Sequence, residues 1–351
     1  MRQVGILGLP GAGKTTLFEV LMQGAGTPHA ASAAREHVGV VRVPDERMDR
    51  LTVLFRPKKI TFTQIQFVDS GAAGHASGRP GKGADLFHGV RECDALVAVV
   101  RDFENAAVPI EGGVDPARDL RSLETELLLN DLVIVETRME RIEKEMRVGK
   151  RQGEQEHALL ARCHKLLEGE RPLRAERFDA EELRRLRGFQ LLSQKPLLVV
   201  YNQDEHSTRT PADAGPHTLA VALRGHLEAE IVALPPEERA AYRQELGIVE
   251  DGLSVVIRAC YQLLGLISFF TVNAEELHAW TLTRGETAVA AAGEIHTDLA
   301  RGFIRAEIVN WKTLVERGGH APARAAGALR LEGREYVVQD GDCLEIRFNR
   351  T

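Results

Sequence analysis

Eight residues near the start of the chain have the types and spacing of a phosphate-binding loop, Gly8-Leu9-Pro10-Gly11-Ala12-Gly13-Lys14-Thr15, which reads G-x-x-x-x-G-K-T. An apolar run at 4–7 precedes them and a helical pattern at 16–22 follows, so we expect a strand, a loop and a helix. The N–H groups of such a loop and the amino end of its helix can surround a phosphate group. The Lys14 ammonium can reach β- and γ-phosphates, and the Thr15 hydroxyl can ligand Mg²⁺. We predict nucleotide contacts at Gly8, Pro10, Gly11, Ala12, Gly13, Lys14, Thr15 and Thr16.

A second candidate segment, Phe67-Val68-Asp69-Ser70-Gly71, ends an apolar run with an acid and a small turn. We predict that Asp69 holds Mg²⁺ together with Thr15, through water, in the Walker B role. An ordinary turn at the end of a strand is the alternative reading. Gly71 is the residue that we expect at the γ-phosphate.

A third segment, Asn202-Gln203-Asp204-Glu205, follows a buried-strand pattern at 195–201. P-loop GTPases carry N-K-x-D at this point, where the Asn braces the loop and the carboxylate pairs with guanine. Here Gln203 replaces the lysine and Glu205 replaces the aspartate, so the carboxylate lies one methylene further out. Because losing a charged hydrogen bond costs about 1.5–3 kcal/mol, we predict that ATP is preferred over GTP. Asn202, Gln203 and Glu205 are the expected residues at the base.

The elements that must position these residues begin with an α/β pattern. Apolar runs alternate with helical patterns, which is typical of a parallel sheet covered by helices. From residue 115 to 194, apolar residues recur at spacings of three and four, with a break at 149–153. That period predicts an inserted antiparallel helical hairpin. The strands expected in the nucleotide-binding domain, residues 1–114 and 195–265, include 4–7, 38–43, 60–68, 95–100 and 195–202.

The remaining residues, 266–351, show many short strand patterns and one helical pattern at 289–296, which predicts a small α+β domain. The hairpin tip, residues 138–151, has six basic residues against three acidic ones. This excess fits either a contact surface for RNA or a solvated helix face. The C-terminal domain is near balance, with ten Lys and Arg against twelve Asp and Glu from residue 267 onward. Its expected strands lie at 267–271, 278–282, 304–309, 335–338 and 343–348.

Composition narrows the function classes. The formal net charge of −6 argues against a globally basic nucleic-acid-binding protein, and we expect no DNA partner. The four cysteines are far apart in the sequence, which argues against a disulfide framework and a zinc site. No apolar run approaches the length of a membrane span, and no leader pattern is visible. We therefore expect a cytoplasmic protein.

With these motifs together, the chain resembles the YchF/Obg-like ATPases, a family of P-loop NTPases related to translation factors, over nearly its whole length. The resemblance implies a Ras-like P-loop domain with an inserted hairpin, followed by a TGS domain, which is a ubiquitin-like β-grasp module. It also implies binding and hydrolysis of ATP, with GTP weaker, and association with the ribosome or its RNA. Besides the phosphate loop and Asn202–Glu205, it rests on 38–45, 56–59, 91–95, 114–119, 296–298, 302–307 and 338–342.

Three departures from the family pattern lie around the γ-phosphate. The family's switch I threonine has no match in Ala33-Ala34-Arg35-Glu36-His37, although Ser32 is adjacent. The second switch, D-x-A-G in the family, appears one residue short after Asp69. The family's histidine falls near Pro109, which cannot transfer protons. His75 could instead orient water, although an ordinary exposed loop histidine is the favoured reading of this residue. Because positioning and electrostatics carry phosphoryl transfer, we predict slow hydrolysis.

Four functions stay open on the sequence alone. The first is a slowly hydrolysing, ATP-binding switch that contacts the ribosome. The second is a nucleotide-sensing adaptor without hydrolysis, or an RNA-binding module. The third is a GTPase, and the fourth is a small-molecule kinase that shares the P-loop.

Overall fold

The computed structural model describes residues 1–24, 37–69, 87–148, 153–207, 209–211, 217–248 and 250–349. By its contacts the chain divides into two compact units. The first consists of Met1–Val41 and Ile65–Leu263, and the second of Arg42–Gln64 and Leu264–Thr351. Residues 42–64 therefore belong to the unit that contains the C-terminal module, whereas the sequence analysis assigned them to the nucleotide-binding domain.

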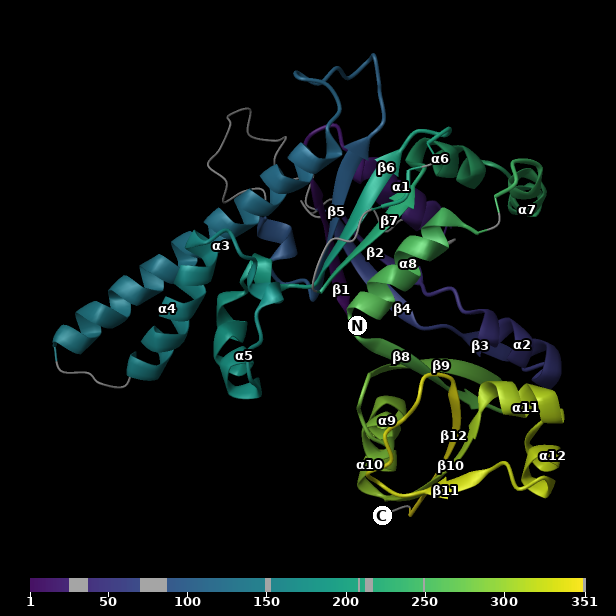
Figure 1. Cartoon of the computed structure of the whole chain (residues 1–351). Coiled ribbons are helices and arrows are strands. Elements are labelled where there is room, and N and C mark those ends of the chain that lie inside the picture. The colour runs from purple at the N-terminus through teal and green to yellow at the C-terminus, as the bar shows by residue number, and fades with distance from the viewer. Residues whose placement is uncertain are drawn as a thin grey trace. The chain divides into compact units, whose positions relative to one another are not determined.

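The first unit is built on a six-stranded sheet in the order β2-β4-β1-β5-β6-β7 (Figure 1). Strands β4, β1, β5, β6 and β7 run parallel to one another, so their carboxyl ends meet at one edge of the sheet. Every residue of β5 is buried, as the continuous apolar run predicted for a central strand. The strands are β1 (Gln3–Gly8), β2 (His37–Arg42), β4 (Gln64–Asp69), β5 (Ala95–Asp102), β6 (Leu197–Gln203) and β7 (Thr218–Leu223).

Helices cover both sides of this sheet (Figure 1). Three of them, α1 (Lys14–Gly24), α6 (Gly225–Ala233) and α8 (Gly252–Leu263), lie together on one side. The next helix, α7 (Pro236–Glu245), begins with a proline followed by Glu237 and Glu238, residues that favour the first turn of a helix. The first part of α3 (Pro116–Arg147) contacts β5 on the other side.

The predicted hairpin is confirmed and consists of α3 and α4 (Glu154–Glu168), with the short α5 (Ala180–Leu186) beside them (Figure 1). Helix α3 begins with Asp115 as its N-cap, whose side chain accepts a hydrogen bond from Arg118 N at 2.9 Å. The core of the hairpin includes Val135, Ile142, Leu159 and Cys163, which are apolar residues of the expected helical period. The hairpin is thus held by burial of one continuous apolar stripe.

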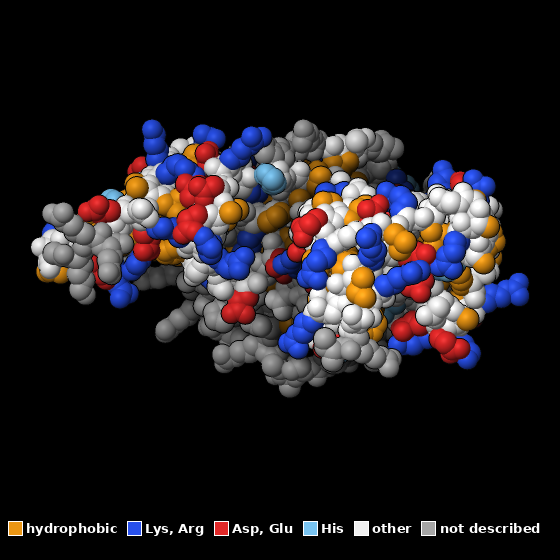
Figure 2. Space-filling view, turned by 90° about the horizontal axis from the view of Figure 1, so that it is seen from below, with side chains coloured by type: hydrophobic (Ala, Val, Ile, Leu, Met, Phe, Trp, Pro, Cys, Tyr) orange, Lys and Arg blue, Asp and Glu red, His pale blue; other side chains and the backbone are white. Residues whose placement is uncertain are grey.

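The basic residues of the hairpin are largely paired with acids. Arg138 binds Glu156 at 2.7 Å, and within α3 Arg141 and Lys144 pair with glutamates one helical turn away. Figure 2 shows Lys and Arg side chains next to Asp and Glu over this part of the chain. Such pairs reduce the positive potential that the sequence count suggested.

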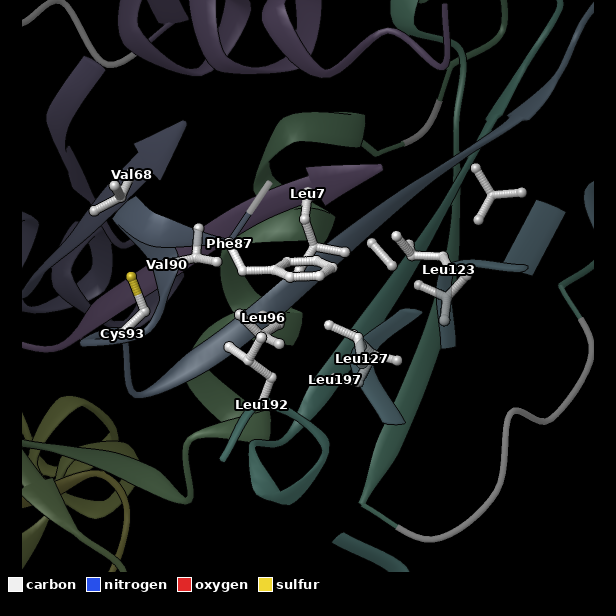
Figure 3. Packing of buried hydrophobic residues seen from close by; sticks show 13 residues of the cluster. Leu7, Val68, Phe87, Val90, Cys93, Leu96, Leu123, Leu127, Leu192 and Leu197 are labelled. Carbon is white, nitrogen blue, oxygen red and sulfur yellow. The ribbon is translucent and has the colours of Figure 1, made fainter. Parts of the chain in front are cut away.

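A compact apolar cluster joins the root of the hairpin to the sheet (Figure 3). Leu7 and Leu96 from the sheet pack against Leu123 and Leu127 of α3. Phe87, Val90 and Cys93 also belong to the cluster, as does Leu192 of the short 3₁₀ helix η6 (Leu192–Gln194).

A buried carboxylate fixes the end of the insertion beside this cluster. Asp131 of α3 has no exposed surface and accepts hydrogen bonds from Leu192 N at 2.8 Å and Ser193 N at 2.7 Å. These are the first N–H groups of η6, which have no partner within that helix. Burial raises the pKa of Asp131, and the hydrogen bonds from Ser193 and Leu192 act in the opposite direction.

The second unit is a mixed sheet in the order β11-β10-β12-β8-β9-β3. Strands β8 and β9 form an antiparallel pair, β12 lies parallel to β8, and β10 lies antiparallel to β12. This arrangement, with a helix after the first pair, confirms the predicted α+β fold of the C-terminal part. The strands are β3 (Lys59–Thr61), β8 (Leu266–Val272), β9 (Glu276–Thr283), β10 (Phe303–Asn310), β11 (Arg330–Glu332) and β12 (Asp342–Phe348).

Both faces of this second sheet are covered. One face buries Phe269 and Ile308 together with Ala291 of α9 (Ala288–Ile295), which continues into α10 (Thr297–Arg301). The other buries Phe270 against Met48 of α2 (Glu46–Phe55) and Leu314 of α11 (Trp311–Arg317), with α12 (His320–Ala325) beside them. Helix α2 therefore completes a core whose strands come almost entirely from the end of the chain.

Three local predictions were wrong. The single strand expected at 60–68 is two strands, because β3 pairs with β9 in the second unit whereas β4 pairs with β1 in the first. Residues 335–338 form no strand and contribute only one bridge, Thr287 to Val337. The C-terminal part also has more helices than the one expected at 289–296, since α10, α11 and α12 were not foreseen.

Within the described ranges, no helix has both the length and the apolar character that crossing a membrane requires. All four cysteines are free and buried, and burial raises the pKa of the Cys163 thiol to about 11.

Replacing the buried carboxylate tests its structural role. We expect Asp131→Ala to lower the free energy of unfolding by about 2–6 kcal/mol, because two buried N–H groups lose their acceptor at about 1–3 kcal/mol each. Urea denaturation measures the change. As a control, Asp179→Ala removes the exposed N-cap of α5 and should cost only about 1 kcal/mol. A change at Asp131 no larger than that of the control would refute the assignment.

Candidate nucleotide site

The loop between β1 and α1 has a backbone that only glycine permits at two points. Gly13 has φ +97°, and a Cβ there would lie 2.3 Å from Asn202 Nδ2. A Cβ on Gly8 would lie 2.5 Å from the carbonyl oxygen of Val99 on β5. The loop therefore sits directly against β5 and β6, and its glycines allow this close approach.

Lys14 lies at the first turn of α1 and folds back over this loop. Its ammonium donates to the carbonyl oxygens of Gly8 at 2.9 Å and Leu9 at 3.1 Å. Burial lowers the pKa of Lys14, and the Asp69 carboxylate acts in the opposite direction. A polyphosphate bound in the loop would favour the charged form of this ammonium further.

Asn202 holds the loop from the end of β6, as the sequence analysis expected of this asparagine. Its Nδ2 donates to Ala12 O at 3.1 Å, and its Oδ1 accepts from Gly225 N at 3.0 Å. Only 7% of Asn202 is exposed. One side-chain amide therefore joins the phosphate loop to the first residue of α6. It supplies the hydrogen bonds that Ala12 O and Gly225 N would otherwise make with water.

The candidate metal ligands lie at the same edge of the sheet. Asp69 is the last residue of β4, is 2% exposed, and stands opposite Ile6 of β1 in the parallel register. Thr15 is exposed in the first turn of α1, next to Thr16. A carboxylate and a hydroxyl are oxygen donors that suit Mg²⁺. Gly71, Ser32 and His75 lie outside the described residues.

The base loop after β6 is only partly arranged as the sequence suggested. Glu205 is half-exposed, and its carboxylate lies 3.2 Å from Nδ1 of His226 on α6. Gln203 instead turns inward, where its amide donates to Asp102 Oδ2 at 3.0 Å and to Arg209 O at 3.2 Å. That amide is thus occupied within the protein, and a nucleotide contact of Gln203 stays a prediction.

Three residues at this edge were missed by the sequence analysis. Gly225 and His226 begin α6, and a small residue followed by a polar one after the β7 pattern was the available signal. Arg101 lies near the end of β5 and is almost fully buried. A basic residue that ends an otherwise apolar strand is the signal that could have marked it.

These residues together can hold a polyphosphate chain and a divalent cation. The loop offers backbone N–H groups at the amino end of α1, Lys14 offers a cation, and Thr15 with Asp69 offers oxygen ligands. The half-exposed Glu205 carboxylate beside His226 can accept hydrogen bonds at the edge of a purine. The arrangement fits Mg²⁺ with a nucleoside triphosphate.

The comparison with known proteins agrees with this geometry. Residues 266–349 match the family YchF-GTPase_C, described as "Protein of unknown function (DUF933)". The chain is 38% identical to the "Ribosome-binding ATPase YchF" of Bacillus subtilis (strain 168), with 98% of each chain covered. It is 37% identical to the protein of the same name from Escherichia coli O157:H7, again with 98% of each covered.

A solved structure gives the same result for the fold. The Schizosaccharomyces pombe YchF GTPase is similar to this chain with a TM-score of 0.85 at 29% sequence identity. The similarity covers 99% of this chain and 97% of the other. The predicted fold class, a P-loop domain with an inserted hairpin and a C-terminal α+β domain, is thereby confirmed.

Removing the bridging amide tests the site's construction. We expect Asn202→Ala to lower the free energy of unfolding by about 2–4 kcal/mol, because a buried carbonyl and a buried N–H lose their partner. Asn202→Asp should cost at least as much, since it still accepts from Gly225 N but sets a buried carboxylate oxygen against Ala12 O. Urea denaturation measures both, with Asn105→Ala, an exposed turn asparagine, as the control. Equal stability of Asn202→Ala and the control would contradict the bridge.

Proposed function

The chain belongs to the YchF family of P-loop NTPases, and from this premise we propose that it is an ATP-binding switch that hydrolyses slowly and acts on the ribosome. The observation that carries the proposal is the braced phosphate loop, in which Lys14 covers the loop carbonyls and Asn202 fixes Ala12. A loop that is held in place from β6 before the ligand arrives loses less conformational freedom on binding.

Mg²⁺, when bound, would bridge phosphate oxygens and neutralise the charge that develops during transfer. In this chain Thr15 and Asp69 would hold it. Lys14 would hold the β- and γ-phosphates, and burial strengthens its electrostatic effect because less water screens the charge. The aligned amino end of α1 adds a further favourable potential for the anion.

The preference for adenine rests on Glu205. In N-K-x-D proteins a shorter carboxylate pairs with two N–H groups of guanine, and the additional methylene here moves the carboxylate away from that position. The hydrogen bond between His226 and Glu205 further restricts where this carboxylate can lie. A lost charged hydrogen bond of about 1.5–3 kcal/mol corresponds to a tenfold change in affinity or more.

We propose slow hydrolysis because the sequence lacks a histidine and a threonine that the family has near the γ-phosphate. Pro109, an exposed residue after β5, stands near the position of the family's histidine and carries no group that can move a proton. The switch I region has no threonine at the matching position. Binding through the loop can persist without these groups, whereas turnover depends on positioned water and charge.

The ribosome is proposed as partner because the curated relatives are named as ribosome-binding ATPases. The hairpin and the C-terminal unit are the candidate contact surfaces, and such a partner implies action in the cytoplasm. Lys and Arg are interspersed with Asp and Glu on the face shown in Figure 2. Contact by shape and specific hydrogen bonds is therefore favoured over bulk attraction to RNA phosphates.

Nucleotide choice is tested by calorimetric titration of ATP and GTP with Mg²⁺. We expect ATP to bind at least about tenfold more tightly, and Glu205→Asp to reduce this ratio about tenfold. Glu230→Asp is the matched control, since Glu230 also lies near His226, at 3.6 Å, but outside the base loop. Lys14→Ala should weaken both nucleotides about 100-fold. Tighter binding of GTP by the wild type would overturn the adenine assignment.

The partner and the rate are tested with purified ribosomes. We expect co-sedimentation that differs between ATP and ADP, and that loses this difference in Lys14→Ala. A single-turnover assay with Mg²⁺-ATP should show slow phosphate release, because positioning groups are missing. No phosphate release with or without ribosomes would instead support the adaptor, and no co-sedimentation in any nucleotide state would contradict the ribosome proposal.

A further inference from the structure

Arg101 is an unusual residue for the centre of a parallel sheet. It is the second-last residue of β5, only 2% of it is exposed, and it is among the largest fully buried side chains. A buried guanidinium is costly unless anions or hydrogen bonds compensate its charge. The hydrogen bonds and charges around the Arg101 guanidinium therefore indicate its role.

The compensation of this charge is incomplete. Nε donates to Phe103 O at 3.0 Å, Nη1 donates to Val108 O at 2.9 Å, and the guanidinium lies over the Phe103 ring at 4.7 Å. Among the residues that the structure describes, no carboxylate pairs with Arg101. In contrast, the other deeply buried arginine, Arg174, is paired with Glu124.

The guanidinium lies against the phosphate loop. A Cβ on Gly11 would be 3.4 Å from Arg101 Nη1 and 3.4 Å from Val108 Cγ1. The Arg101 side chain thus lies next to Gly11, and its hydrogen bonds hold the residues after β5 beside it. The positive charge and the loop that would hold phosphates are neighbours in the same protected environment, where charges interact strongly.

The base loop supplies no cation at this place. Gln203 stands where N-K-x-D proteins have lysine, and its neutral amide is directed to Asp102. Arg209, whose carbonyl oxygen accepts a hydrogen bond from that amide, has an exposed side chain that pairs with Asp102 at 2.7 Å. Arg101 is therefore a buried positive charge beside the phosphate loop that no carboxylate of the described residues pairs with.

We propose that Arg101 is a positioning residue of the nucleotide site that does two things. Its charge complements the polyphosphate through the field across Gly11, and its two hydrogen bonds hold segment 103–108 against the loop. The inference rests on the proposed nucleotide binding and goes beyond it by assigning a second cation besides Lys14. It accounts for an arginine that is buried without a carboxylate, because the bound polyphosphate supplies the missing negative charge.

The test compares AMP, ADP and ATP in calorimetric titrations of wild type, Arg101→Met and Arg101→Lys. We expect Arg101→Met to weaken ADP and ATP about tenfold and AMP much less, because the electrostatic effect grows with the number of phosphates. Arg101→Lys keeps the charge and should recover most of the affinity. Arg209→Met is the matched control and should leave all three affinities unchanged. Urea denaturation of each variant checks the fold, and Arg101→Gln replaces Arg101→Met should the latter fail to fold.

The outcomes separate the two proposals. An equal loss for AMP, ADP and ATP, with no recovery in Arg101→Lys, would show a merely structural role and overturn the inference. Unchanged affinities in Arg101→Met would overturn it as well. Absence of binding to the wild type would refute the nucleotide site itself, and with it this inference.

Discussion

The arrangement of the first unit depends on a single buried amide. Asn202 donates to the loop after β1 and accepts from the start of α6, and these two segments are far apart in the sequence. Ala12 O and Gly225 N are buried with the amide, so the loss of either hydrogen bond would leave a buried polar group without a partner. The glycines at positions 8 and 13 are a consequence, since the loop must approach β5 and β6 more closely than a side chain allows.

A second set of polar contacts at the end of β5 keeps the carboxylate of Asp102 apart from the guanidinium of Arg101. Asp102 at the end of β5 receives Gln203 and Arg209, while its neighbour Arg101 turns to the opposite side, toward Gly11. Because successive side chains of a strand point to opposite faces, the ion pair of Asp102 and Arg209 lies on one face of β5 and the Arg101 guanidinium, which has no carboxylate partner among the described residues, lies on the other. Asp102 therefore contacts residues 203 and 209, at and after the end of β6, whereas Arg101 lies beside Gly11 of the loop after β1.

The sequence predicted the parts of this site that depend on local pattern. The G-x-x-x-x-G-K-T spacing located the phosphate loop, and the apolar runs located β1, β5 and β6. Long-range pairing was not visible: residues 60–68 read as one strand because no Gly or Pro interrupts them, and only pairing with β9 and β1 divides them. The orientation of Gln203 could not be predicted either, because its hydrogen-bond partner Asp102 lies on the neighbouring strand β5, far away in the sequence.

The crossing of residues 42–64 into the second unit has a consequence for how the protein is made. Met48 and Leu51 are fully buried against strands from the end of the chain, so their binding surface does not exist until the ribosome has synthesised those strands. Until then a nascent chain displays an amphipathic α2 with nothing to cover it, which is a state prone to aggregation. A fragment that begins at residue 266 would have the complementary defect, an apolar sheet face that lacks its helix.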